Sequence, residues 1–386
     1  MSPPGLLPPR DADAHLRVLL LHNRYRAAGG EERVVDELEA LLRARGHAVA
    51  RLERDSSEAG RGRAARGMLR GGVDAGDVAK AVRLHRAGVV HAHNLHPLFG
   101  WRALAAARTA GARTVLHVHN YRLVCAIGVA FRDGEPCYSC HGRDTAPGVR
   151  HRCRGSVAEG AVYAVGIARQ QPRLLAHADR LVAVSGALAG GLSRMGIPRE
   201  RMTVLPNAVR TIAERSHAAE GAYALAAGRL VEEKGFDVAI RVARAAGVPL
   251  RIAGAGPEEE RLRTLAAGDD VTFLGRLSGE ALARERRGAA VLLAPAHSDD
   301  PCPMTVIEAL ADGLPVLGSD RGGIPELVGE EASLPVDDES AWVAALRALW
   351  SDPAARATAG AAALDRARTD HSPDAWYKGL MEVYGR

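Results

Sequence analysis

The chain has 386 residues, 47% of them apolar and 25% charged, which excludes disorder, collagen and coiled coil as descriptions of the whole chain. Its 51 basic residues exceed its 46 acidic ones for a net charge of +5, but only three of the basic residues are lysines, and aromatic residues make up 4%. Surfaces on which bases could stack are therefore scarce, and we expect no nucleic-acid partner.

The chain begins with a Pro-rich segment, Met1–Arg10, which lacks the basic and apolar parts of a secretory signal. No apolar run reaches the roughly 18–20 residues that cross a bilayer. We therefore expect a cytoplasmic protein, in which an Arg-rich face makes at most peripheral contact with anionic lipid at the inner face of the membrane.

Short apolar runs then alternate with longer amphipathic stretches, a pattern typical of βαβ units and parallel sheets. One example of a helix is Glu31–Arg45, whose apolar residues recur at helical spacing. The expected strands of the N-terminal half are Arg17–His22, Val89–His93, Thr114–His119, Arg180–Val184 and Thr203–Leu205.

The alternation stops at a polar stretch, Thr211–Glu220, and then restarts. The expected strands of the C-terminal half are Tyr223–Ala227, Leu250–Ala253, Val271–Leu274, Ala290–Ala294 and Pro315–Gly318. We therefore predict an α/β protein with a domain over 1–207, a second over 208–370 and a terminal helix within 371–386 that could pack back on the first. Two doubly wound sheets facing each other leave a cleft at the ends of their strands.

A Gly-rich turn follows the first expected strand. In LHNRYRAAGGEERVV, Gly29 and Gly30 separate that strand from a helix. Glycines let the backbone approach an anion, and a helix start presents free N–H groups to it. Taken alone, such a pair is more often a plain tight turn, and the GxGxxG spacing of dinucleotide-binding proteins is absent.

A basic cluster comes next along the chain. Arg61, Arg63, Arg66 and Arg70 are interspersed with glycines. It could bind an acidic surface, but we interpret it as a mobile loop of solvated arginines.

Histidines gather at the ends of two neighbouring expected strands, in VVHAHNLHP and TVLHVHN. Alternation along a strand turns His91 and His117 to the same face as the two strand-end histidines. Taken singly, a histidine is more often a satisfied core residue, but this group could bind sugar hydroxyls or act in acid–base chemistry. The residues expected at this rim of the cleft are His93, Asn94, His96, His119 and Asn120.

Two basic residues follow the first strand of the C-terminal half, in GRLVEEKGFD. Arg229 and Lys234 lie between a strand and a helix, where two cations suit a diphosphate. A structural salt bridge is the alternative. Lys234 is conspicuous in a chain with three lysines.

A Pro-rich irregular segment leads into a helix in SDDPCPMTVIEALADGLPVLGSDRGGIPEL. Asp300 and Glu308 are eight positions apart, so that a loop carboxylate and a helix carboxylate can face one sugar nucleotide. The N–H groups of Met304, Thr305 and Val306 lie at the helix start and can meet phosphate.

These motifs, in this order, resemble the family-4 retaining glycosyltransferases of the GT-B fold, from about Leu16 to the end of the chain. The most specific are GG(x)E near the N-terminus, GRLVEEKGFD, AGAGPEEERL, VTFLGRLS and the segment ending IEALADGLPVLGSDRGGIPELV. The resemblance implies two Rossmann-like domains around a cleft.

It also implies roles for single residues at the donor. Arg229 and Lys234 would contact the donor diphosphate, and Glu308 would hold the nucleotide ribose. Asp300 stands where the family has a glutamate that contacts the donor sugar; the shorter side chain keeps the charge and loses about one methylene of reach. Leu277, which follows FLG, would contact the base through its backbone.

Two further correspondences lie in the N-terminal half. Gly29 and Gly30 match the glycine loop of the family, and His119 matches its strand-end histidine.

Four of the five cysteines lie close together, with spacings x11, x2 and x12. Cys125, Cys137, Cys140 and Cys153 fall in an insert over about 121–160 on the acceptor side. Their spacing favours a tetrahedral structural zinc site, and some members of the family have a similar insert. An iron–sulfur cluster, free or redox-active thiols and plain packing stay open, while disulfides are disfavoured in a reducing compartment. Cys302, in the donor loop, is interpreted as a packing residue.

The resemblance thus implies a retaining transferase, which moves a sugar from a nucleoside diphosphate sugar, with UDP or GDP the most expected, to a hydroxyl acceptor. The acceptor could be a glycan, a lipid-linked sugar or a natural product. No catalytic divalent metal is required. A sugar-nucleotide epimerase or phosphorylase of the same fold, and a non-catalytic nucleotide-sugar-binding protein, stay open as alternatives.

Overall fold

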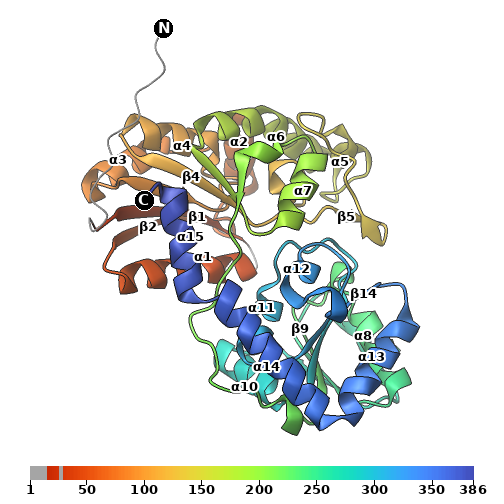
Figure 1. Cartoon of the computed structure of the whole chain (residues 1–386). Helices are drawn as coiled ribbons and strands as arrows, with labels where there is room; N and C mark the ends of the chain where they lie inside the picture. Colours follow the sequence, from red (N-terminus) through yellow and green to blue (C-terminus); the bar gives the residue numbers. More distant parts are fainter. Residues whose placement is uncertain (1–14, 26–28) are drawn as a thin grey trace.

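The computed structural model describes residues 15–25 and 29–386, so that the expectation for Met1–Arg10 lies outside the described residues. The chain forms two halves, each a parallel sheet with helices on its faces (Figure 1). The predicted α/β fold with two doubly wound sheets is confirmed. The boundary at 207–208 stays a prediction; the last strand of the first sheet ends at Val204, and the first strand of the second begins at Ala224.

The six strands of the N-terminal sheet are all parallel. In spatial order they are β2 (Ala48–Asp55), β1 (Arg17–Arg24), β3 (Val89–Ala92), β4 (Arg113–Val118), β7 (Arg180–Ala183) and β8 (Met202–Val204). The order of the strands reverses between β1 and β3. Open α/β sheets bind their ligands beyond the carboxyl ends of the strands at such a point.

The C-terminal sheet also has six parallel strands. In spatial order they are β11 (Val271–Gly275), β10 (Leu250–Ala253), β9 (Ala224–Ala227), β12 (Val291–Ala294), β13 (Val316–Ser319) and β14 (Ser333–Leu334). Counted along this half, the order is 3-2-1-4-5-6, that of the dinucleotide-binding Rossmann fold. Its reversal lies between β9 and β12.

Helices cover both sheets because their apolar faces pack on the strands. In the N-terminal half they are α1 (Gly30–Ala44), α2 (Arg61–Arg70), α3 (Ala75–His85), α4 (Gly100–Thr109), α5 (Ala146–Arg150), α6 (Val157–His177) and α7 (Gly186–Arg194). In the C-terminal half they are α8 (Phe236–Ala246), α9 (Glu259–Leu265), α10 (Gly279–Gly288), α11 (Met304–Ala311), α12 (Ile324–Val328), α13 (Glu339–Ser351) and α14 (Pro353–Asp370).

The interpretation of Arg61–Arg70 as a loop is wrong, because these residues form helix α2. One of its glycines, Gly67, lies in a tight contact, and so does a glycine of the neighbouring helix α6. A Cβ on Gly67 would lie 2.3 Å from the Pro97 carbonyl oxygen, and one on Gly166 of α6 would lie 2.8 Å from Met68. The absent side chain at Gly166 lets α2 and α6 approach each other closely, and that at Gly67 lets α2 approach Pro97.

The strand β2 was not expected from the sequence. Four of its eight residues are charged, and its side chains are only partly buried. It lies at the edge of the sheet, where charged side chains are tolerated and protect the free edge.

The terminal helix α15 (Pro373–Tyr384) returns to the N-terminal half, as the blue segment near the C label shows (Figure 1). The Tyr384 hydroxyl lies 2.8 Å from His91 Nδ1, and the Tyr384 carbonyl accepts a hydrogen bond from Arg113. Tyr377 bonds to His47 at 2.9 Å. The helix therefore ties the end of the chain to the first sheet.

Candidate active site

A cleft of about 660 Å³ lies between the two halves. This volume falls within the range of about 300–1,000 Å³ that is usual for small-molecule sites. The expected residues that line it are Gly29, Gly30, His119 and Asn120 from the N-terminal half, and Arg229, Lys234, Asp300, Met304, Thr305 and Val306 from the C-terminal half. Residues almost 280 positions apart are thus brought to one site.

The two basic residues of GRLVEEKGFD both line the cleft. Arg229 Nη2 lies 3.1 Å from Glu233, and Lys234 Nζ forms an ion pair with Asp300 Oδ2. Gly235 has φ of +67°, and a Cβ there would lie 1.8 Å from the Pro295 carbonyl oxygen. Only glycine allows the turn that presents Lys234 to the loop after β12.

Helix α11 begins at Met304 and points its first turn at the cleft. The Gly-rich turn of the other half approaches it closely, since a Cβ on Gly30 would lie 3.4 Å from Met304 Cγ. The N-terminus of a helix carries partial positive charge and favours phosphate. The helix start and the two cations therefore lie on the same side of the cleft, together with the carboxylates of Glu233 and Asp300.

Glu308 and Leu277 do not line this cleft. Glu308 is buried, with Oε2 2.8 Å from Arg286 and Oε1 2.8 Å from Arg33 of helix α1. Burial raises its pKa, and the two guanidinium groups oppose the rise. Leu277 packs beside the hydrophobic core.

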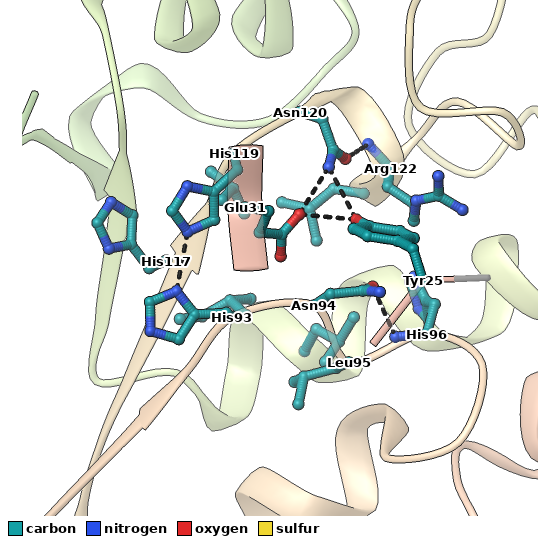
Figure 2. Close-up of a pocket in the computed structure, with 14 residues that line it drawn as sticks. Tyr25, Glu31, His93, Asn94, Leu95, His96, His117, His119, Asn120 and Arg122 are labelled. Atoms are coloured by element: carbon teal, nitrogen blue, oxygen red, sulfur yellow. Dashed lines mark hydrogen bonds between the residues drawn. The ribbon is translucent and has the colours of Figure 1, made fainter. Parts of the chain in front are cut away.

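A second, smaller cavity of about 30 Å³ adjoins the cleft, and Figure 2 shows the side chains around it. This is room for about one water molecule. His119 and Asn120 line both spaces, whereas His93, Asn94 and His96 line only the small cavity. The structure therefore brings the predicted acceptor-side residues together, but three of them lie behind the cleft.

The histidines form a stacked, buried group. His93 Nδ1 lies 2.9 Å from His119 Nε2, and His91 Nε2 lies 3.2 Å from His117 Nδ1. The rings of His117 and His119 stack with centroids 4.4 Å apart. Burial holds the pKa of His93, His117 and His119 well below the usual range and lowers that of His96 to about 4. These rings are therefore neutral at pH 7.

In the part of the chain that the structure describes, one group of three potential metal ligands has its ligand atoms within 4.8 Å of one another: His91, His93 and His117. The His91 and His93 rings stack nearly parallel, at 4°. Both nitrogens of His91 already bond, to Tyr384 and His117. This arrangement suits a hydrogen-bonded stack.

Glu31 is a site residue that the sequence analysis missed. Its carboxylate points into the group of Figure 2 and lines both the cavity and the cleft. Glu31 Oε2 accepts hydrogen bonds from Tyr25 Oη at 2.7 Å and from Asn120 Nδ2 at 3.2 Å. Burial raises its pKa. The available signal was a glutamate directly after Gly29-Gly30 at a helix start.

The next residue, Glu32, uses its carboxylate to bind the backbone at the Gly-rich turn. Its oxygens accept hydrogen bonds from the backbone N–H of Gly29, at 2.7 Å, and of Tyr25, at 3.0 Å. Burial raises the pKa of this carboxyl, but its hydrogen bonds outweigh that effect and lower the pKa to about 2. Glu32 thus binds the backbone of both Tyr25 and Gly29, and it lines the cleft beside Glu31.

The cysteine insert carries Cys125, Cys137, Cys140 and Cys153 as free thiols. They do not come within 4.8 Å of one another in a group of three among the described residues. Burial, and next the nearby Cys125, raise the pKa of the Cys140 thiol to about 11. Cys302 is buried within the donor loop, residues 298–303, which agrees with a packing role, and burial raises its pKa to about 12.

Comparison with protein families divides the chain in the same way as its two sheets. Residues 28–212 match the family Glycosyltransferase Family 4, and residues 210–366 match Glycosyl transferases group 1. The chain is a GT4-like protein with a glycosyltransferase domain in each half. The resemblance predicted from the motifs is confirmed at this level, and a subgroup with a four-cysteine insert stays a prediction.

Two curated relatives show how much of this GT4-like chain aligns with known proteins. It is 29% identical over 239 residues to the amylovoran biosynthesis glycosyltransferase AmsK of Erwinia amylovora, covering 56% of this chain and 59% of that protein. It is 29% identical over 319 residues to the D-inositol 3-phosphate glycosyltransferase of Saccharomonospora viridis, covering 71% and 70%. The chain spans about half the length of the first curated relatives it matches.

Solved structures share the fold. Sucrose-phosphate synthase from Thermosynechococcus elongatus has a TM-score of 0.69 at 17% identity, covering 96% of this chain and 98% of its own. HepE of Anabaena, in complex with UDP, has a TM-score of 0.62 at 17% identity, covering 96% and 100%. The GT4-like chain therefore has the GT-B fold. In its described part, no helix is both long and apolar enough to cross a membrane.

Proposed function

We propose that this chain is a retaining glycosyltransferase, which moves a sugar from a nucleoside diphosphate sugar to a hydroxyl acceptor. The observation that carries the proposal is the cleft. It combines two cations, Arg229 and Lys234, and the start of helix α11 on one side with His119 and Glu31 on the other. The first set suits a diphosphate, and the second offers hydrogen-bonding groups to a sugar or an acceptor hydroxyl.

In this proposal the protein acts mainly by electrostatics. As the bond between the sugar and the diphosphate breaks, negative charge grows on the leaving group. Arg229, Lys234 and the first turn of α11 would stabilise that charge, because they are fixed in the cleft before the reaction starts. The departing diphosphate would assist deprotonation of the acceptor on the same face of the sugar, which retains the anomeric configuration. No divalent metal is needed for this step.

The acceptor would lie against the N-terminal half. His119 and Asn120 line the cleft and would contact it directly, while His93, Asn94 and His96 would hold His119 and the backbone in place from behind. Since burial keeps these imidazoles neutral, they would serve as hydrogen-bonding partners for hydroxyl groups rather than as cations.

The donor most expected is a UDP-sugar or a GDP-sugar. Structures of HepE, which has the same fold, contain UDP and UDP-glucose. A relative named for GDP-mannose, the alpha-mannosyltransferase of Mycobacterium tuberculosis, is 31% identical over 160 residues. The name of AmsK favours a growing polysaccharide as acceptor. Free cysteines fit the proposed cytoplasmic location, where thiols stay reduced.

The test is titration calorimetry with UDP, GDP and dTDP, followed by incubation with the sugar nucleotide of the best binder. We expect a dissociation constant of about 1–1,000 µM, the usual range for enzyme substrates, and slow release of the nucleotide by hydrolysis even without an acceptor. Absence of binding to all three nucleotides would contradict the proposal.

One observation favours a second candidate, a non-catalytic nucleotide-sugar-binding protein. Asp300 stands where the family has a glutamate, and it is paired with Lys234. Binding of a sugar nucleotide with neither hydrolysis nor transfer to any acceptor would support this alternative. Release of free nucleotide or transfer would exclude it.

A further inference from the structure

The cysteine insert reaches the donor side of the cleft. It leaves the N-terminal half after β4 and contains the hairpin of β5 (Phe131–Arg132) and β6 (Glu135–Pro136), which projects toward the C-terminal half (Figure 1). Glu135 Oε2 lies 4.0 Å from Arg321 Nη2 of that half. A module that the sequence placed on the acceptor side thus contacts the opposite half as well.

The strongest contact is made by Tyr138, which lies between two of the cysteines. Its hydroxyl donates a hydrogen bond to Asp299 Oδ2, the residue directly before Asp300. The ring is fixed on two sides. It packs edge-on against Tyr121 with centroids 5.9 Å apart, and the Arg194 guanidinium lies 4.3 Å from its centroid.

Other groups of the N-terminal half converge on the same aspartate. Arg194 Nη2 lies 3.6 Å from Asp299 Oδ2, and the Tyr121 hydroxyl donates to the Asp299 carbonyl at 3.3 Å. The Asp299 side chain is 15% exposed. A carboxylate sheltered from water gains more from donors than an exposed one, so these contacts hold the residue firmly.

Further contacts link Asp299 to the part of the donor loop that lines the cleft. The other Asp299 oxygen, Oδ1, accepts a hydrogen bond from Gly322 N at 3.2 Å, and Gly323 N donates to the Asp300 carbonyl at 2.8 Å. Asp300 in turn pairs with Lys234. One carboxylate is therefore held from both halves, one residue away from the ion pair that lines the cleft.

We propose that Tyr138 is a positioning residue for the donor site: its hydroxyl fixes Asp299 and, through the loop, the placement of Asp300 and Lys234. The cysteine insert then connects the N-terminal half to the donor loop through this hydrogen bond. The effect on donor binding rests on the proposed function, but the restraint on the loop does not.

The first experiment measures amide hydrogen exchange over residues 298–303 in the full chain. Tyr138→Phe removes one hydroxyl and keeps the ring and its packing. A hydrogen bond to a charged group is stronger than one between neutral groups, so we expect exchange of the loop to become about tenfold faster, with the melting temperature little changed. Tyr163→Phe is the matched control, because Tyr163 belongs to α6 and packs beside Met68, with the Arg154 guanidinium over its ring. Equal exchange in wild type and Tyr138→Phe would overturn the proposal, whether or not the protein binds a nucleotide.

The second experiment follows the consequence at the site, with UDP and GDP as probes. In Tyr138→Phe we expect the dissociation constant for the better nucleotide to rise about fivefold or more, and Tyr163→Phe to match wild type. A double-mutant cycle with Asp299→Asn should show that the two changes are not additive, as expected for partners in one contact. Additive effects would overturn the proposal. If wild type binds neither nucleotide, the proposed function fails, and the exchange experiment alone decides this inference.

Discussion

The Arg33 guanidinium, on helix α1 of the N-terminal half, lies 2.8 Å from the carboxylate of Glu308 on helix α11 of the C-terminal half. The same carboxylate is held at 2.8 Å by Arg286. The two partners differ in exposure: the side chain of Arg33 is 41% exposed and that of Arg286 only 7%. Glu308, which is predicted to hold the nucleotide ribose, therefore has one buried partner, Arg286, and one partly exposed partner, Arg33.

This difference predicts unequal effects on stability. Removing one partner of a buried ion pair leaves a charge without compensation and costs about 3–5 kcal/mol, whereas an exposed pair contributes about 0–1 kcal/mol. We expect Arg286→Ala to lower the free energy of unfolding by the larger amount and Arg33→Ala by the smaller. Urea denaturation followed by circular dichroism measures both, and similar losses in the two variants would contradict the assignment of Arg286 as the structural partner.

Lys234 is expected to act on turnover rather than on stability. Its ion pair with Asp300 is partly exposed, so its loss should change the free energy of unfolding by about 1 kcal/mol or less. Removal of one preorganised group that stabilises developing charge typically lowers turnover by about 100–1,000-fold. We expect Lys234→Ala to show this loss in release of nucleotide from the donor. Lys378→Ala, on helix α15, is the control and should match wild type; near-normal turnover in Lys234→Ala would count against a diphosphate role.

The spacing of the four insert cysteines predicts a structural metal site, although no three of their sulfur atoms lie within 4.8 Å of one another in the described residues. Purified protein should contain about one equivalent of zinc, because four thiolates complete a tetrahedral site. Cys140→Ser should reduce the bound metal, and Cys302→Ser, which changes the fifth cysteine, should not. Inductively coupled plasma mass spectrometry gives both values. Less than about 0.2 equivalents of zinc or iron in wild type would exclude a structural metal site.

Local sequence patterns predicted most of the strands and several residues that line the cleft. Apolar runs at regular spacing indicated the strands, and the motif GRLVEEKGFD indicated Arg229 and Lys234, because both residues lie next to a strand end and need no distant partner to reach the cleft. The missed features depend on tertiary contacts. Strand β2 is charged and owes its formation to its neighbour β1. The bond from Tyr138 to Asp299 joins residues 161 positions apart, a distance at which the sequence carries no pairing signal.

The buried histidines predict a loss of stability at mildly acidic pH. Burial lowers the pKa of His91 to about 3 and of His96 to about 4, against an ordinary value of 6.5. When the pH lies between the lowered pKa of the folded chain and the ordinary value of 6.5, the unfolded chain binds more protons than the folded chain. The free energy of unfolding therefore falls as the pH drops below about 6.5. Each such group contributes a slope of up to about 1.4 kcal/mol per pH unit. We therefore expect His91 and His96 alone to lower the free energy of unfolding by about 2–3 kcal/mol between pH 6 and pH 5, above the range in which most carboxylates titrate. Urea denaturation at pH 7, 6 and 5 measures the slope; His96→Gln should make it shallower, while the exposed His151→Gln should leave it unchanged. A free energy of unfolding that stays constant from pH 7 to pH 5 would show that these imidazoles can be protonated in the folded chain.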